Sequence, residues 1–274
     1  MRILISNDDG YRAGGIHVLA RIMASFGDVT VVAPKYHQSA MSMAVSLGMK
    51  KLAYKKLPDE GPGKWAYLDA TPASCVKFGL EYGYENRDPD LVICGINHGS
   101  NASMGANYSA TLGGAEEGAL NGCKAIGVST ADFRPDADFS QVEKYLPGLV
   151  KTLLSNWPDR FGIYYNINFP KAEIPIRGIR VARQGKGHWV KEFEHWNEEE
   201  LRRRGLDHDF LWRSSGGDLE QGEEAYFMIG TFVDDETETE TADHSLNAAG
   251  WITVTPCSVD LTDYGEYDRL KTLL

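Results

Sequence analysis

The sequence MRILISNDDG, residues 1–10, decides the fold, because an apolar strand gives way there to polar residues and a glycine. Residues 3–5 form a continuous apolar run, which is typical of a strand buried on both faces of a sheet. Asp8 and Asp9 follow, and two adjacent carboxylates repel each other unless a positive charge lies nearby. Neighbouring strand residues point to opposite faces, but where Gly10 lets the chain turn, both aspartates can face one ligand.

Apolar strands and amphipathic helices alternate outward from this point. Further strands are predicted at residues 28–34, 89–97, 124–130 and 162–170, and helices at 16–26, 71–82, 111–121 and 139–154. The strands show no alternating polar face, which indicates a mainly parallel sheet covered by helices on both sides. The sequence therefore predicts a doubly wound α/β fold.

The regular alternation ends near residue 170. Strands are predicted again at 178–184, 225–232 and 250–256, whereas residues 185–224 are charged and rich in glycine and tryptophan. We expect an α/β core in residues 1–170 and a β-rich extension in residues 171–274, with a hairpin arm. Trp189, Trp196 and Trp212 are expected to pack within the arm or against a partner, with stacking on a nucleobase as the alternative.

Composition excludes several classes of protein. The chain has 39 acidic and 28 basic residues and a net charge of -11, which argues against a protein that coats nucleic acid. No apolar run is long enough for a membrane span, and the strand that begins near Met1 leaves no room for a signal peptide. The 4 cysteines contain no C-x-x-C pair, as expected of buried thiols in a reducing compartment. We therefore expect a cytoplasmic location.

Polar side chains also end the strand predicted at 89–97. Asn97 occupies a strand-end position equivalent to that of Asp8 and can offer an amide oxygen to the same ligand. Open α/β sheets bind ligands at the carboxyl ends of their strands, so we expect one shared site. Oxygen donors of this kind suit a divalent cation such as Mg²⁺, Mn²⁺ or Ca²⁺. The structural alternative is an Asp-Gly turn with an aspartate that caps a helix.

A helix is predicted to begin near Ser109 and Thr111. Free N–H groups at a helix start bind anions, and hydroxyl groups there add donors, so this segment predicts an anion site. The alternative is a polar loop that only satisfies its own backbone. Asp243 and His244 form a weaker candidate pair, for which a helix cap with a solvated histidine is the structural alternative.

Several segments together resemble the SurE family of metal-dependent nucleotidases. They are ILISNDDG, DATPASCV, PDLVICGINHGSN, YSATLGGAEEGAL, INFP and TVTPCSVDLT, and they span nearly the whole chain. The resemblance implies a Rossmann-like three-layer α/β/α core and a C-terminal arm used for subunit exchange or dimerisation, hence a homodimer or homotetramer. It also implies a phosphomonoesterase that acts on nucleoside monophosphates at the 5′ position, with 3′ activity as a further possibility, and one divalent metal ion.

The resemblance also implies roles for individual residues. The metal ligands would be Asp8, Asp9, Ser39 and Asn97, the phosphate would lie at Asn101, Ser109 and Thr111, and the two aspartates would be catalytic. Asp8 would accept a proton or attack phosphorus itself. The chain departs from the family pattern at Ala40 and Ala110, where the family usually has glycine.

Two other classes of protein serve as alternatives. A dinucleotide-dependent oxidoreductase would share the fold, but Asp-Asp-Gly stands where its G-x-G-x-x-G sequence belongs. A non-catalytic metal- or nucleotide-binding module would share the site and lack turnover. Metal-dependent release of phosphate from an aryl phosphate distinguishes an enzyme from such a module.

Overall fold

The computed structural model describes residues 1–274 except 49–50, 59, 84–88 and 204–218. Trp212 therefore lies outside the described residues. Among the residues described, none of the helices has both the length and the apolar character that a membrane span requires.

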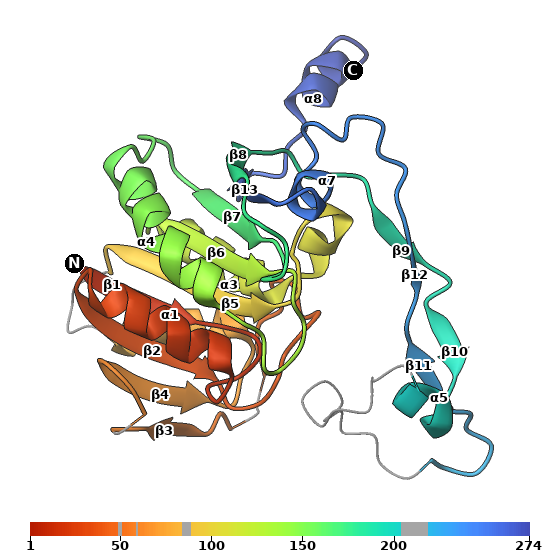
Figure 1. The fold of residues 1–274 in the computed structure, drawn as a ribbon, viewed down its shortest axis with the longest axis horizontal. Coiled ribbons are helices and arrows are strands. Elements are labelled where there is room, and N and C mark those ends of the chain that lie inside the picture. The colour runs from red at the N-terminus through yellow and green to blue at the C-terminus, as the bar shows by residue number, and fades with distance from the viewer. Residues whose placement is uncertain (49–50, 59, 84–88, 204–218) are drawn as a thin grey trace.

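A nine-stranded sheet forms the centre of the molecule, in the order β3-β4-β2-β1-β5-β6-β7-β13-β8 (Figure 1). Its strands are β1 (Arg2–Ser6), β2 (Asp28–Pro34), β3 (Tyr54–Lys56), β4 (Lys64–Leu68), β5 (Leu91–His98), β6 (Ala125–Thr130), β7 (Ile163–Phe169), β8 (Gly178–Val181) and β13 (Trp251–Ser258). The pairs β3–β4 and β13–β7 are antiparallel, and the other pairs are parallel. The predicted α/β fold with a mainly parallel sheet is confirmed.

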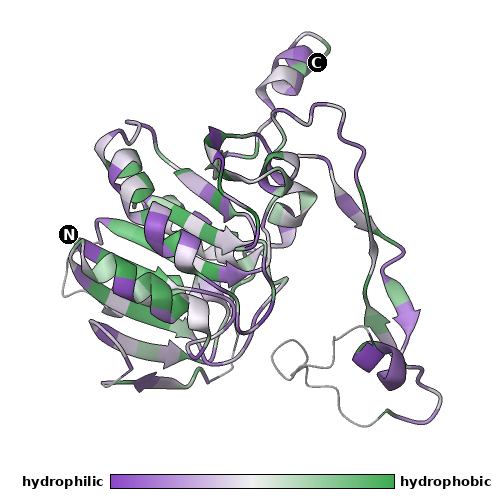
Figure 2. Ribbon diagram, viewed as in Figure 1, coloured by the Kyte–Doolittle hydropathy of each residue, from purple (hydrophilic) through white to green (hydrophobic). Residues whose placement is uncertain are grey.

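Helices cover both faces of this sheet. The helices are α1 (Gly14–Ala24), α2 (Pro72–Tyr82), the 3₁₀ helix η1 (Ser103–Tyr108), α3 (Ala110–Leu120), α4 (Ser140–Ser155), α5 (Glu198–Arg203), α7 (Asp243–Ala248) and α8 (Tyr264–Lys271). Helices α1 and α4 pack on one face, and α2 and α3 on the other (Figure 1). Hydrophobic residues concentrate in the central strands, whereas α5 is hydrophilic (Figure 2). The sheet thus has a separate apolar core on each side.

A long arm leaves the sheet after β8 (Figure 1). It contains β9 (His188–Val190), β10 (Phe193–His195), β11 (Tyr226–Met228) and β12 (Thr231–Val233), paired antiparallel as β9–β12 and β10–β11. Near its root, Arg183 Nη2 lies 2.7 Å from Glu236 Oε1. After the arm the chain returns through α7 to β13, which enters the main sheet between β7 and β8.

Candidate functional site

The end of β1 forms a closed turn that presents two carboxylates. Asn7 Nδ2 donates to the Gly10 carbonyl oxygen at 2.9 Å, and Gly10 adopts a φ of +93°, which favours glycine. The Tyr11 N–H donates to the Pro34 carbonyl oxygen at 3.0 Å and ties the turn to the end of β2. The turn therefore holds both aspartates at the carboxyl edge of the sheet, where β1 lies between β2 and β5.

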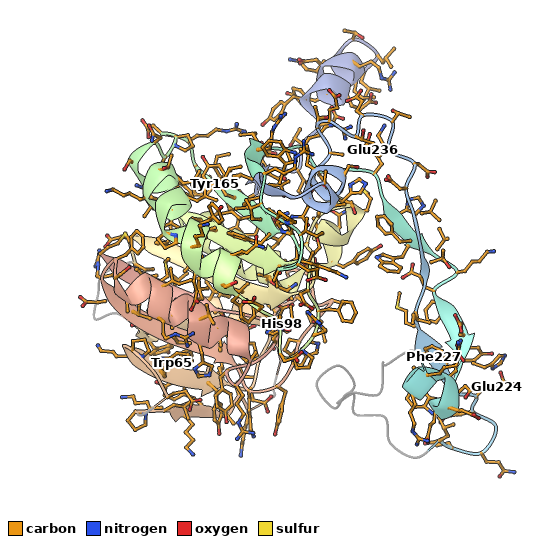
Figure 3. The ribbon with its side chains drawn as sticks, viewed as in Figure 1. Trp65, His98, Tyr165, Glu224, Phe227 and Glu236 are labelled. Carbon is orange, nitrogen blue, oxygen red and sulfur yellow. The ribbon has the colours of Figure 1, made fainter. Side chains whose placement is uncertain are left out.

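Both carboxylates are buried, with Asp8 3% and Asp9 7% exposed. Thr111 Oγ1 donates to Asp8 Oδ1 at 2.5 Å. The His98 N–H donates to Asp9 Oδ2 at 3.1 Å, and His37 Nδ1 lies 3.5 Å from Asp9 Oδ1. Groups from α3, from β5 and from the loop after β2 thus converge on the pair. Figure 3 shows His98 at the sheet edge that faces the arm, with Phe227 and Glu224 farther out on the arm.

The electrostatics of the pair favour a bound cation. Burial raises the pKa of both aspartates, and the charge of Asp9 raises the pKa of Asp8 further. The pKa of His37 is lowered, first by burial and then by the nearby His98, so His37 is mainly neutral at pH 7. Among the residues that the structure describes, no lysine or arginine forms an ion pair with either aspartate. The positive charge that the pair requires is therefore not supplied by these residues.

Asn97 and Ser39 lie on two segments that meet this pair. Asn97 is buried, and its Nδ2 donates to the Gly99 carbonyl oxygen at 2.8 Å, which leaves the amide oxygen to bind a cation. Ser39 lies in the exposed loop after β2, where the neighbouring Gln38 N–H donates to the Asp8 carbonyl oxygen at 2.7 Å. The structure thus places Asn97 one residue from the contact between His98 and Asp9, and Ser39 one residue from the contact between Gln38 and Asp8.

These donors fit a hard divalent cation. Two carboxylates, an amide oxygen and a hydroxyl supply oxygen atoms only, which is the chemistry that Mg²⁺, Mn²⁺ and Ca²⁺ prefer. Over the described ranges of the chain, no three or more His, Cys, Asp or Glu side chains gather so that they could hold a metal ion.

Helix α3 begins beside the pair and provides an anion-binding end. Ser109 Oγ accepts the Leu112 N–H at 3.0 Å and caps the helix, whose first N–H groups carry the positive end of the helix dipole. A Cβ at Gly113 would lie 2.1 Å from the Ser42 carbonyl oxygen, so glycine permits the close approach of the Ser39 loop. The Ser39 loop and the start of α3 are thus packed side by side.

Two of the residues predicted at the phosphate make other contacts in this structure. Thr111 is fully buried and bonds to the aspartate pair, as described above. Asn101 Nδ2 donates to Ser129 Oγ at 2.7 Å, and the Asn101 N–H donates to Asn168 Oδ1 at 2.8 Å. Asn166 Nδ2 donates in turn to the Asn101 carbonyl oxygen at 2.8 Å. Asn101 is therefore held in a buried amide network, and its contact with a phosphate stays a prediction.

Sequence analysis did not identify the other members of this network. Asn166 and Asn168 alternate along β7, so both side chains lie on the same face of an otherwise apolar strand. That alternation within YYNINF was the signal in the sequence. Ser129, in the neighbouring strand β6, carried no comparable signal.

Asp243 connects the start of η1 to the root of the arm. Its Oδ1 accepts the N–H groups of Ser103, Gly185 and His244 at 2.9, 3.0 and 2.8 Å. His244 Nε2 lies 3.1 Å from Asp234 Oδ1, so this histidine has an acidic partner. The alternative of a helix cap with a solvated histidine is wrong, because the N-cap residue of α7 is Ala242 and the His244 side chain is only 14% exposed.

A cavity of about 650 Å³ adjoins the Ser39 loop. Its lining includes Ala40 and Tyr108 from the site loops and Lys186 and Trp189 from the arm. Trp189 packs edge-on against Phe232, with ring centroids 5.5 Å apart, and remains 52% exposed. The cavity therefore offers an aromatic surface next to the candidate cation site.

Fold and site together define a class of protein. It is an α/β protein whose parallel sheet carries a buried, all-oxygen acidic site at its carboxyl edge, beside the anion-binding start of a helix.

Comparison with known proteins identifies the family within this class. The family described as Survival protein SurE matches residues 3–191. The 5′-nucleotidase SurE of Cytophaga hutchinsonii is 36% identical over 95% of this chain and 92% of its own, and that of Bacteroides fragilis is 33% identical over 98% and 96%. The crystal structure of the SurE protein from Aquifex aeolicus aligns over 100% of this chain and 99% of its own, with 29% identity and a TM-score of 0.75. The chain belongs to the SurE family.

Proposed function

We propose that the protein is a metal-dependent phosphomonoesterase that hydrolyses nucleoside monophosphates to nucleoside and phosphate. The observation that carries this proposal is the buried Asp8–Asp9 pair beside the capped start of α3. A cation site and a phosphate site on one sheet edge meet the two main requirements for cleaving a phosphate monoester. Relatives at 36% and 33% identity carry the name 5′-nucleotidase SurE, which supports the same substrate class.

We assign one divalent cation, Mg²⁺, Mn²⁺ or Ca²⁺, to Asp8, Asp9, Ser39 and Asn97. When bound, such an ion polarises a phosphate oxygen and lowers the pKa of a coordinated water. The donor chemistry of these residues and the raised pKa values of the two aspartates support the assignment.

The chain's own groups position the reaction. Thr111 orients the Asp8 carboxylate, and the backbone N–H of His98 orients that of Asp9. The Ser109 hydroxyl and the first N–H groups of α3 bind the phosphoryl oxygens and stabilise the charge that develops on them. Asp8 either takes a proton from the attacking water or attacks phosphorus itself.

The cavity at Ala40, Tyr108 and Trp189 supports a nucleoside as the leaving group, because a base can stack there while its phosphate reaches α3. We further propose a cytoplasmic location and a homodimer or homotetramer formed through the arm. The exposed aromatic residues of the arm, Trp189, Trp196 and Phe193, support such an assembly.

Phosphate release from adenosine monophosphate and from p-nitrophenyl phosphate tests the function. We expect turnover with Mg²⁺ or Mn²⁺ and none with a chelator. Asp9→Asn should lose activity, whereas Asp28→Asn, an exposed aspartate at the opposite edge of the sheet, should keep it. Metal-dependent binding of the nucleotide without any phosphate release would favour the non-catalytic module instead.

A further inference from the structure

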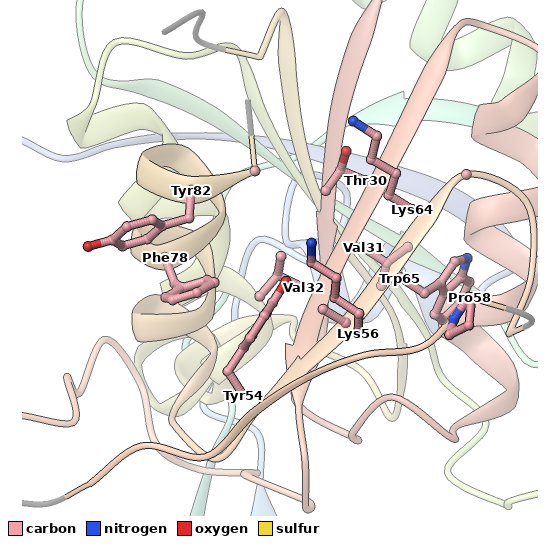
Figure 4. Close-up of a pocket in the computed structure, with 13 residues that line it drawn as sticks. Thr30, Val31, Val32, Tyr54, Lys56, Pro58, Lys64, Trp65, Phe78 and Tyr82 are labelled. Carbon is pink, nitrogen blue, oxygen red and sulfur yellow. The ribbon is translucent and has the colours of Figure 1, made fainter. Parts of the chain in front are cut away.

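A second cavity, of about 490 Å³, lies toward the amino ends of β2 and β4, whereas the aspartate pair lies at the carboxyl ends of the strands. Its lining includes Thr30 near the start of β2, and Gly63 and Lys64 at the start of β4 (Figure 4). Strands β1, β2 and β4 are parallel, so the amino ends of β2 and β4 are remote from the carboxyl end that carries Asp8 and Asp9. This cavity is therefore separate from the candidate active site.

Strand register explains why the sheet is hollow there. Lys56 pairs with Ala66, and Ala66 pairs with Val32, so these three residues form one row on the face that α2 covers. Helix α2 packs over β2 and β1, which leaves the strands at the edge of the sheet beside it rather than beneath it. The methyl group of Ala66 is too small to fill the space between the helix and the lysine. The surface of the sheet is therefore depressed along this row of β3, β4 and β2.

Aromatic side chains form one wall of the cavity. The rings of Tyr54 and Phe78 have centroids 4.9 Å apart, and those of Phe78 and Tyr82 are 4.7 Å apart. Tyr82 is 67% exposed and Tyr54 43%, which is unusual for a stacked cluster of large rings. Such a wall can hold a planar ring.

Two lysines face the same space as this wall (Figure 4). Lys64 lies two residues before Ala66, which is the partner of Lys56. The two lysines are therefore diagonal neighbours on antiparallel strands, with Cα atoms roughly 7–8 Å apart. In the described part of the chain neither ammonium group forms an ion pair, although the protein carries a net charge of -11. Glu81, on the same helix as the aromatic wall, raises the pKa of the neighbouring Tyr82. Two ammonium groups that no described carboxylate neutralises favour an anionic ligand.

We propose that this cavity binds a small aromatic phosphate, with its ring against Tyr54, Phe78 and Tyr82 and its phosphate between Lys56 and Lys64. The Thr30 hydroxyl lines the same cavity and adds a donor for the phosphate. Binding here does not require a metal or turnover, so the site is independent of the proposed hydrolysis.

Pyridoxal 5′-phosphate is a suitable probe, because it is an aromatic phosphate whose aldehyde reacts with lysine. The amine and the aldehyde condense to an imine with loss of water, and borohydride reduces the imine to a stable secondary amine. Peptide mapping of the protein labelled in chelator should find about tenfold more label on Lys56 and Lys64 than on Lys55. Lys55 is the matched control, because it is exposed on the same strand and pairs with Tyr67 on the other face.

Competition identifies the chemistry that is recognised. Adenosine monophosphate should protect Lys56 and Lys64, whereas adenosine, without the phosphate, and inorganic phosphate, without the ring, should protect them less. Equal labelling of Lys55, or equal protection by adenosine and its monophosphate, would overturn the proposal. The double variant Lys56→Gln/Lys64→Gln should keep its hydrolysis of p-nitrophenyl phosphate, so failure of this site is distinguishable from failure of the proposed function.

Discussion

The hydrogen bond from Thr111 to Asp8 joins the phosphate side of the site to the cation side. Thr111→Val removes the donor and keeps the branched shape. Because groups that orient metal ligands typically change metal affinity 10–100-fold, we expect Mg²⁺ or Mn²⁺ binding to weaken about tenfold. Metal titration by calorimetry measures this. Thr152→Val, which removes an exposed hydroxyl bonded to the Gly148 carbonyl oxygen, should leave the affinity unchanged.

The carboxylate pair also makes the stability of the metal-free protein depend on pH. Burial raises the pKa of Asp8 from 3.8 to about 7 in the folded state. The folded state then binds more protons than the unfolded state between these two values, so its stability is greatest at low pH and falls as pH rises toward 7. In chelator, Asp8→Asn should therefore melt above the wild type at pH 8, with a smaller difference at pH 5.

Excess Mg²⁺ or Mn²⁺ should reverse this order, because the wild type binds the ion more tightly than Asp8→Asn. Thermal melts of both proteins, with and without metal, provide the comparison. Equal metal-induced shifts in the two proteins would mean that the Asp-Asp-Gly turn has a structural role only.

The Ser39 loop carries backbone strain at Ala40 and Ser42. Ala40 has a φ of 59° and Ser42 a φ of 47°, both in the left-handed region. That conformation costs alanine about 1–2 kcal/mol, partly offset in a glycine variant by the greater freedom of the unfolded chain, about 0.4–1 kcal/mol. Ala40→Gly should thus stabilise the protein by up to about 1 kcal/mol in denaturant unfolding. Ala172→Gly, without a positive φ, should destabilise it.

At this scale the sequence predicted where the polar residues of the site lie better than it predicted their contacts. Asp8 and Asp9 follow the end of β1, and Asn97 lies near the end of β5. The carboxyl ends of neighbouring parallel strands meet by topology alone. The partner of Thr111 and the enclosure of Asn101 depend on how α3 and β7 approach the site. Such side-chain geometry arises from packing between distant segments, so the sequence pattern did not contain it.

Among the elements, the start of α3 combines a structural and a functional role. Ser109→Ala removes the cap from Leu112 and should lower the free energy of unfolding by about 1 kcal/mol. It also removes a phosphate donor, so the KM for p-nitrophenyl phosphate should rise. Asp263→Ala, which uncaps the exposed helix α8, should leave KM unchanged. An unchanged KM in Ser109→Ala would exclude Ser109 from the phosphate site.

The elements that the sequence predicted are those with long apolar patterns. Strands β1, β2, β5, β6 and β7 and helices α1 to α4 all lie at or near their predicted ranges. Two short strands were missed, β3 at the edge of the sheet and β4 beside it, because YKK is polar and KWAYL is brief. Helix α5 lies in the charged segment 185–224, for which no helix was predicted, and i to i+3 and i to i+4 ion pairs such as Arg203–Glu200 support it.

For the whole molecule, the exposed apolar residues of the arm indicate that copies of the chain associate. Phe193 is 71% exposed and Met228 56%, and they are register partners on β10 and β11. We expect sedimentation velocity to give a dimer or tetramer at micromolar concentration. Phe193→Glu on the arm should shift the protein toward monomer, whereas Phe161→Glu, also 67% exposed but outside the arm, should not. A single monomer species over a wide concentration range would contradict the proposed assembly.

The return of β13 to the main sheet has a consequence for synthesis on the ribosome. Strand β7 ends at Phe169 and its partner β13 begins at Trp251, roughly 80 residues later. At about 5–20 residues per second, the nascent chain displays the open edge of β7 for roughly 4–16 s. An open edge of this kind can pair with the wrong strand, including the same strand of a neighbouring nascent chain. Release of the chain before residue 258 would therefore leave an unfinished sheet, so the first 170 residues depend on the last segment for a closed core.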